Sequence, residues 1–595
     1  MDNSQSETAE NLPEAPLSQQ VSDAPTSWYS FTRKKSVQVS NTSIKEVEKT
    51  KYYEAQGTTR FTQQSLKPQV ITHKWKNLLK LIVNGDQPFS LVEEEDGRNF
   101  CFDLNPSIEI PCRKTLRKEI IKVHSSLKNY LKDVLNNASG KFNVTTDGWT
   151  SLTGSHYFGI TVHFLHQWAL RSYVIGFVHL SENHTAINIA DLLVELFKDF
   201  EIQERILSVT IDNAANMKAA MDILVYRGII KFYRRCGAHT LNLIIKSGLR
   251  ELGSVEHDDS EVQETHSDLG KIRAFVRKLH KSCSVLERWR VFLAVDNKKV
   301  NLTIPTDVAH RWNSTYLMVS RYLELRKTVE RTLVGDEDEE ILRIADYSKT
   351  EYLCQLLKRF YDTTVKLSER KQTTCSEYML LMDELGAILA TRGQELEMDG
   401  FEDEQLQSMI NTMMERMYEF SDHTYDFFNK ITTVLDPRIK LQLSPLTESE
   451  KRVFESRFAT MFEGLAMNLN EAATEECRTR TSGLLGGILR KRLGENAVSV
   501  MRSTNELSMY TSEPVIHDES DVLLYWANQE QRYPKLCVVA KDYMSVQPTS
   551  IPCEQLFSLA SNVITKKRAS LADDAIEAIM TLKSWFKCRE LDSRW

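Results

Sequence analysis

The spacing of apolar residues predicts helices and strands in a recognisable order. Between residues 112 and 137, leucine, isoleucine and valine recur every three or four positions, which predicts one amphipathic helix. Three runs rich in β-branched and aromatic residues follow, with short polar breaks that favour an antiparallel meander. These strands are expected at residues 142–147, 157–166 and 171–180.

The pattern next alternates between helices and strands. Thr185 can cap a helix that reaches residue 200, and residues 205–212 have the length and β-branching of a buried strand. A helix at 213–225, a fifth strand at 229–234 and a helix at 240–249 are expected to follow. This part of the chain therefore indicates an α/β fold.

A different pattern begins near residue 255. From there to residue 520 the apolar spacing is that of long helices, which are interrupted by acidic breaks at residues 336–340 and 395–404. We therefore expect a mainly helical domain. Apolar residues become denser again after residue 521, and helical spacing is clear at Ala575, Ile576, Ile579, Leu582 and Phe586.

Composition narrows the class of protein. A chain of 595 residues, 41% hydrophobic and 26% charged, is long enough for two to four globular domains. No apolar run approaches the roughly 18 residues of a membrane span, and the polar start does not resemble a signal peptide, so we expect an intracellular protein without a membrane partner. The ten cysteines include no Cys-x-x-Cys pair, which argues against common zinc fingers and a disulfide framework.

Charge is unevenly distributed near the start of the chain. Residues 1–27 contain five acids and no Lys or Arg, which predicts a disordered acidic segment. Residues 28–80 contain eleven Lys or Arg against three Glu, a net charge of +11 − 3 = +8. This basic segment could lie on DNA phosphates, or it could be a solvated linker.

Two acids follow predicted strands and are candidates for chemistry. Asp147 and Asp212 would lie at one rim of the sheet if their strands are neighbours. Carboxylates suit Mg²⁺, and two such ions about 4 Å apart can serve phosphoryl transfer. Alternatively, Asp147 starts an Asp-Gly turn and Asp212 caps the next helix.

Six short motifs give a more specific indication, because they resemble those of the hAT transposases and their relatives, including BED zinc-finger proteins. In order they are Thr146-Asp147-Gly148-Trp149-Thr150-Ser151, Thr210-Ile211-Asp212-Asn213-Ala214-Ala215-Asn216-Met217, Cys236-Gly237-Ala238-His239-Thr240-Leu241-Asn242-Leu243, Arg311-Trp312-Asn313-Ser314-Thr315-Tyr316, Tyr533-Pro534-Lys535-Leu536 and Ser550-Ile551-Pro552-Cys553-Glu554-Gln555-Leu556-Phe557-Ser558.

The resemblance implies an α/β plus α architecture, in which a large helical insertion interrupts an RNase H-like core. After a helical region at 81–141, the first part of the core would occupy 142–250 and the insertion 251–520. A hAT dimerisation region at 521–595 would complete the core and supply a third carboxylate, Glu554. Without the resemblance, Glu554 would pass as a helix-surface acid.

The resemblance also implies roles for individual residues. Asp147, Asp212 and Glu554 would bind Mg²⁺ or Mn²⁺ and carry out catalysis, and His239 would contact phosphate or the active site. A packed Cys236 and a satisfied His239 are the alternative, and no structural zinc is expected because Cys236 and His239 lack a second ligand pair.

Further residues are candidates for DNA contact by the same resemblance. Trp312 would stack on an extruded base beside Arg311. A lone tryptophan after an arginine is more often part of a core, but the surrounding residues 307–310 and 313–316 favour the contact with DNA. Lys566, Lys567 and Arg568 could form a solvated turn or contact DNA.

One family feature is not expected here. A BED finger needs paired cysteines and histidines, yet the first cysteine is Cys101 and His73 is the one histidine before it.

The resemblance implies a nuclear DNA-binding protein that forms a homodimer, or a higher oligomer, through residues 521–595. Two alternatives stay open, which are a transposase with metal-dependent strand cleavage and transfer, and a domesticated non-catalytic transcription regulator or chromatin scaffold.

Overall fold

The computed structural model describes residues 75–107, 109–180, 183–252, 267–308, 311–369, 372–398, 403–476, 506–565 and 571–593. The chain divides into two units, Met1–Lys74 and Trp75–Trp595. The expectations for residues 1–27, and for 28–74 of the basic segment, lie outside the described residues. The last part of that segment belongs to a helix, in which Lys80 pairs with Asp592 at 2.5 Å.

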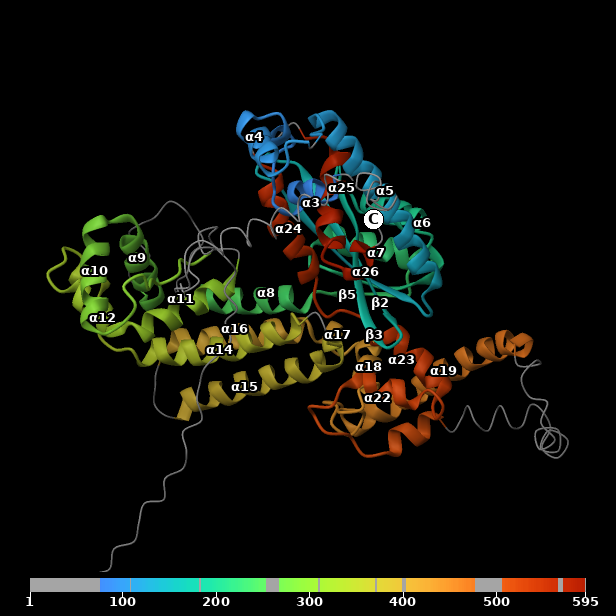
Figure 1. The fold of residues 1–595 in the computed structure, drawn as a ribbon. Coiled ribbons are helices and arrows are strands. Elements are labelled where there is room, and N and C mark those ends of the chain that lie inside the picture. Colours follow the sequence, from blue (N-terminus) through green and yellow to red (C-terminus); the bar gives the residue numbers. More distant parts are fainter. Residues whose placement is uncertain are drawn as a thin grey trace, which may run out of the picture. The chain divides into compact units, whose positions relative to one another are not determined.

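A five-stranded mixed sheet is the centre of the α/β part, with strand order β3-β2-β1-β4-β5 (Figure 1). The strands are β1 (Phe142–Thr150), β2 (His156–His166), β3 (Ala169–His179), β4 (Ile206–Ile211) and β5 (Phe232–Arg235). β1, β2 and β3 pair in antiparallel fashion, which confirms the predicted meander, whereas β4 is parallel to β1 and β5 is parallel to β4.

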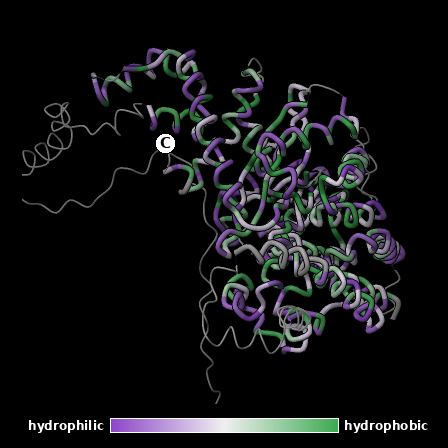
Figure 2. Tube along the Cα trace, turned by 90° about the vertical axis from the view of Figure 1, so that its right-hand side faces the viewer, coloured by the Kyte–Doolittle hydropathy of each residue, from purple (hydrophilic) through white to green (hydrophobic). Residues whose placement is uncertain are grey.

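The described helices follow the amphipathic pattern, and Figure 2 shows hydrophobic and hydrophilic residues alternating along them. They are α3 (Lys76–Asn84), α4 (Glu95–Leu104), α5 (Arg113–Asn137), α6 (Ala186–Asp199), α7 (Ala215–Tyr226), α8 (Gly237–Glu251), α9 (Asp268–Lys281), α10 (Cys283–Val295), α11 (Trp312–Glu324), α12 (Arg326–Leu333), α13 (Glu339–Leu342), α14 (Ser348–Leu367), α15 (Tyr378–Met398), α16 (Glu404–Glu419), α17 (Ser421–Thr424), α18 (Phe427–Val434), α19 (Glu448–Glu476), α22 (Val522–Gln529), α23 (Pro534–Tyr543), α24 (Ile551–Val563), α25 (Asp573–Trp585) and α26 (Arg589–Asp592).

Helices cover both faces of the sheet. The Thr185 hydroxyl accepts a hydrogen bond from Asn188 N, as its predicted capping role requires, so α6 begins at the expected place. Leu196 of α6 packs against Gly176 on one face, while Phe557 of α24 packs against Gly159 on the other. All six residues of β4 are buried, which is typical of a parallel strand covered on both sides.

The sheet draws its hydrophobic core from both ends of the described chain. One cluster of buried residues joins elements between Leu79 and Ile230 to residues between Cys553 and Leu591. A separate cluster, from Leu241 to Phe420, holds α8 together with the helices that follow it. No helix in the described ranges is both long and apolar enough to cross a membrane.

The apolar face of α25 is buried within the chain. Ile576, Ile579 and Leu582 are all at most 6% exposed, and α25 packs against β3 and α5. The resemblance of residues 521–595 to a dimerisation region predicts that this face can bury against a second subunit as well as against the core. In the structure this face packs against the core, so any self-association must use other side chains of residues 521–595.

Candidate active site

Asp147 and Asp212 lie side by side because their strands are neighbours. β1 and β4 are parallel, with Thr145 opposite Thr210. Two residues further along, and so on the same face of the sheet, come Asp147 and Asp212. β1 continues to Thr150, so Asp147 lies inside the strand and does not begin a turn. Asp212 Oδ1 accepts a hydrogen bond from Ala214 N at 3.1 Å, but Ala214 is itself the N-cap of α7 and no side chain caps that helix, so Asp212 shapes the turn before α7 without capping it.

A segment from far along the chain crosses this face of the sheet. Asn143 Nδ2 donates to Asp542 O at 2.8 Å, and Thr210 Oγ1 donates to Gln547 O at 2.8 Å. Ser550 N donates to Cys236 Sγ at 3.2 Å. These bonds hold residues 542–550 across β1, β4 and the start of α8.

The same anchoring sets the start of α24. Cys553 Sγ donates to Thr145 O at 3.4 Å and to Gly159 O at 3.3 Å, so the first turn of the helix rests on β1 and β2. Phe557, one turn later, lies at Gly159, where an added Cβ would meet its ring at 3.1 Å. Glu554 follows Cys553 directly, so the same contacts place it near the two aspartates.

The electrostatics show that the three carboxylates are close. The pKa of Asp147 is raised to about 8, mainly by burial and in addition by the charges of Asp212 and Glu554. Two hydrogen bonds to Asp147 oppose this shift, from Gly148 N at 2.9 Å and from Ser550 Oγ at 3.4 Å. The site therefore concentrates more negative charge than its own hydrogen bonds can stabilise.

A divalent cation would relieve this repulsion. Hard carboxylate oxygens are the ligands that Mg²⁺ and Mn²⁺ prefer. In the arrangement described, no three His, Cys, Asp or Glu side chains in the described ranges stand close enough to hold a metal ion. The donor chemistry of Asp147, Asp212 and Glu554 suits the metal, and their side chains would have to close around it.

His239 belongs to the same neighbourhood. It lies in the first turn of α8, where burial lowers its pKa and the charges of Asp212 and Glu554 act in the opposite direction. Cys236 is buried, and its pKa is raised to about 11 by that burial. The thiol accepts the hydrogen bond from Ser550 N, so Cys236 holds the crossing segment in place.

Gly237 lies between residues 542–550 and Tyr378 of the helical part. Gly237 N donates to Pro548 O at 2.8 Å, and an added Cβ would lie 2.6 Å from the Tyr378 ring. We expect Gly237→Ala to lower the free energy of unfolding by about 1–3 kcal/mol through overpacking, as measured by urea denaturation. Gly386→Ala in α15, whose Cβ would meet nothing closer than 3.7 Å, is the matched control and should not destabilise the protein. Equal effects would contradict this account.

Comparisons with known proteins agree with this arrangement. Three family models match in order, namely the ZBED1 RNase-like domain at residues 145–228, the ZBED1 RNase-like helical domain at 234–356 and the hAT family C-terminal dimerisation region at 506–586. The "Putative AC transposase" of Zea mays is 25% identical over 545 residues, which cover 86% of this chain. The chain is a relative of the hAT transposases.

Other proteins similar to this chain carry different names. The "Putative transcriptional regulator tpeD" of Talaromyces stipitatus is 24% identical and the match covers 92% of the chain, and the zinc finger BED domain-containing protein DAYSLEEPER of Arabidopsis thaliana is 22% identical over 88%. The matches span 65%, 65% and 75% of the maize, Talaromyces and Arabidopsis proteins. This chain therefore matches slightly under two thirds of the maize relative's length.

The structure places the remaining candidates of this hAT relative elsewhere. Trp312 is 4% exposed and belongs to the core of the helical part, whereas Arg311 is exposed at the start of α11. Stacking of Trp312 on a base would require its side chain to leave that core. Lys566, Lys567 and Arg568 lie outside the described residues.

Sequence reasoning missed the residues that position Glu554. Thr145, Ser550 and Cys553 connect the strands to α24, and His163 Nε2 lies 3.0 Å from the Thr145 hydroxyl. The sequence did point to two of them, because Ser550 and Cys553 shortly precede Glu554 in the motif of residues 550–558. Their roles depend on contacts across about 400 residues of sequence, which no local pattern specifies.

Proposed function

We propose that the sheet and its covering helices form an RNase H-like core that a helical insertion interrupts. In support, one hydrophobic cluster unites the sheet with α24 and α25, while helices between α8 and α16 build a separate cluster. Helices α18, α19, α22 and α23 pack in a third cluster, which also includes Leu165, Leu207 and Phe232 of the sheet. An insertion between β5 and α24 accounts for this division, because the chain must leave the first core and return to it.

We further propose that this site carries out Mg²⁺-dependent cleavage and transfer of DNA strands. The observation that carries this proposal is the convergence of three acids from separate stretches of the chain, where burial first, and the charges of Asp212 and Glu554 second, raise the pKa of Asp147 to about 8. Such a cluster is costly unless it serves a cation or a proton.

Each side chain then has a task. Asp147, Asp212 and Glu554 would hold Mg²⁺ or Mn²⁺, which when bound stabilises charge on the attacking and leaving oxygens. Ser550 orients the Asp147 carboxyl through its hydroxyl, and Cys236 fixes the segment that carries Ser550. His239 stands where it can contact a phosphate beside Asp212 and Glu554.

A second candidate is a nuclear regulator or scaffold that keeps the fold without catalysis. The relative named as a transcriptional regulator favours it. A single experiment distinguishes the two candidates. Purified protein and Mg²⁺ are incubated with a duplex that carries the genomic sequence from both sides of the gene, including any inverted repeats found there. Nicking at the repeat ends supports the enzyme, whereas folded protein that binds but never nicks this DNA supports the scaffold.

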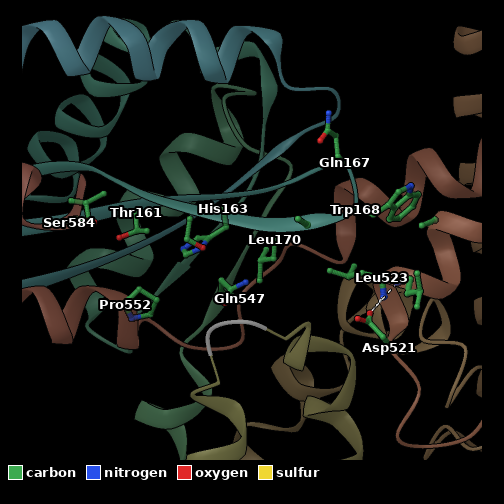
Figure 3. Close-up of a pocket in the computed structure, with 15 residues that line it drawn as sticks. Thr161, His163, Gln167, Trp168, Leu170, Asp521, Leu523, Gln547, Pro552 and Ser584 are labelled. Carbon is green, nitrogen blue, oxygen red and sulfur yellow. Dashed lines mark hydrogen bonds between the residues drawn. The ribbon is translucent and has the colours of Figure 1, made fainter. Parts of the chain in front are cut away.

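We propose that the protein self-associates through α22, which belongs to the matched dimerisation region. Leu524 is 59% exposed there, while Val522 and Trp526 face inward. Leu524 and its neighbour Leu523 line a cavity of about 600 Å³ opposite Leu170 of β3 (Figure 3). Glu530 accepts a hydrogen bond from Trp168 Nε1 at 2.6 Å, which holds the β2–β3 hairpin beside α22 and keeps the cavity open.

Self-association should therefore depend on Leu524. We expect Leu524→Asp to shift the protein towards monomer in sedimentation velocity, because a charge at an apolar interface costs several kcal/mol. Tyr226→Asp on α7 is the matched control, since Tyr226 is 92% exposed outside this region. Unchanged association of Leu524→Asp would refute the assignment of this surface.

A further inference from the structure

Helix α8 presents a row of polar and basic side chains that starts beside the three carboxylates. Its members recur at intervals of three, four and four residues, so they share one face of the helix: His239, Asn242, Lys246 and Arg250. The opposite face, which includes Leu241, Ile244, Ile245 and Gly248, is buried in the helical core. With a rise of 1.5 Å per residue, the row is about 17 Å long.

Charge changes sign along this row. His239 lies within reach of the Asp212 and Glu554 charges, and the charge of Lys246 acts on it from the other side. Lys246 is half-buried and lies about 10 Å along the helix from His239, and Arg250 is exposed further on. A cationic track thus leads directly away from the acidic site.

A third cation stands beside the middle of the row. Asn242 Oδ1 accepts a hydrogen bond from Trp312 N at 3.5 Å, which brings the start of α11 against α8. Arg311 immediately precedes that start and is exposed. Figure 1 shows α8 leading from the sheet into the helical part, where it contacts α11, α14 and α16.

We infer that this α8 row, with Arg311, binds the phosphate backbone of the DNA strand that leads away from the cleavage point. The direction of the strand rests on the proposed function, but phosphate binding by the row does not. At 3.4 Å per nucleotide, about 17 Å spans roughly five phosphates of B-form DNA. Contacts of this kind fix the position of DNA without selecting its sequence.

The test uses a 30-base-pair duplex of arbitrary sequence in buffer without divalent metal, so that no cleavage is needed. Binding is measured against salt concentration for the natural chain and for the double variant Lys246→Gln with Arg250→Gln. We expect the slope of log affinity against log salt to become shallower by about 2, because each phosphate contact contributes about 0.9. Lys246→Arg with Arg250→Lys should keep the natural slope.

The control is the double variant Lys114→Gln with Lys122→Gln, which removes two exposed charges from α5. It should leave the slope unchanged. The inference is overturned if the slope of the α8 variant is unaltered, or if both variants change the slope equally. An unaltered slope is also the result expected if the row binds an acidic protein and not DNA. Arg250→Gln alone, at an exposed position, gives half of the change if the double variant does not fold. Failure of the proposed cleavage would appear only in nicking, so the two outcomes are distinguishable.

Discussion

At pH 8 and without divalent metal, the Asp147→Asn protein is expected to unfold at a higher temperature than the natural chain. Burial and the neighbouring charges raise the pKa of Asp147 from its ordinary value near 4 to about 8. The folded state therefore holds a proton that the unfolded state releases, and stability falls as pH rises from about 4 to about 8. Asparagine carries no charge and avoids this loss, which is on the order of 5 kcal/mol at pH 8 because each pKa unit corresponds to about 1.4 kcal/mol.

The same variant should lose Mg²⁺-dependent DNA cleavage by about 10³-fold or more, because a bound metal supplies several kcal/mol and each 1.4 kcal/mol is a factor of ten in rate. Melting temperatures at pH 5 and pH 8 measure the first effect, and nicking measures the second. Glu195→Gln on exposed α6 should change neither. A stability difference that does not grow with pH would contradict the account of the acidic site.

Trp585→Ala should destabilise the whole α/β part, by about 3–5 kcal/mol in urea denaturation. Trp585 is 1% exposed, and its Nε1 donates to Val174 O at 2.8 Å on the sheet-edge strand β3. Its ring also stacks on His124 of α5 at 5.1 Å. The substitution leaves a cavity where α25, β3 and α5 meet, and it leaves the Val174 carbonyl without this bond.

Val538→Ala is the control for this prediction, because Val538 lies in the same matched region but is 37% exposed. Its stability should be close to that of the natural chain.

Removal of residues 521–595 should cause aggregation and not release a folded monomer, since α24 and α25 complete the core. A soluble, cooperatively folded product lacking residues 521–595 would show that this region serves association alone.

Local pattern was sufficient for the strand runs and for the antiparallel meander, which follow from β-rich runs with short breaks. It left open whether the strands that carry Asp147 and Asp212 are neighbours, and the parallel pairing of β1 with β4 decides this. The end of β1 was misjudged by three residues, because Gly148, Trp149 and Thr150 continue to pair with β2. Pairing with a partner strand determined this boundary, and local propensity does not contain it.

Glu554 and Trp312 illustrate what local pattern cannot provide. Glu554 reaches the aspartates through hydrogen bonds from residues 542–553 to β1, β2, β4 and the start of α8, so only the family resemblance singled it out. The sequence favoured a DNA contact for Trp312, and the packing of the helical part placed it in the core. Long-range packing decides both cases.

The most direct test of the shared carboxylate site replaces Mg²⁺ with Fe²⁺ in the DNA-bound protein and adds ascorbate. Hydroxyl radicals formed at the metal then cut the polypeptide backbone next to it. The account predicts cuts near residues 147, 212 and 554, all lost together in Asp147→Asn. Cuts confined to other segments, or cuts that persist in Asp147→Asn, would contradict it.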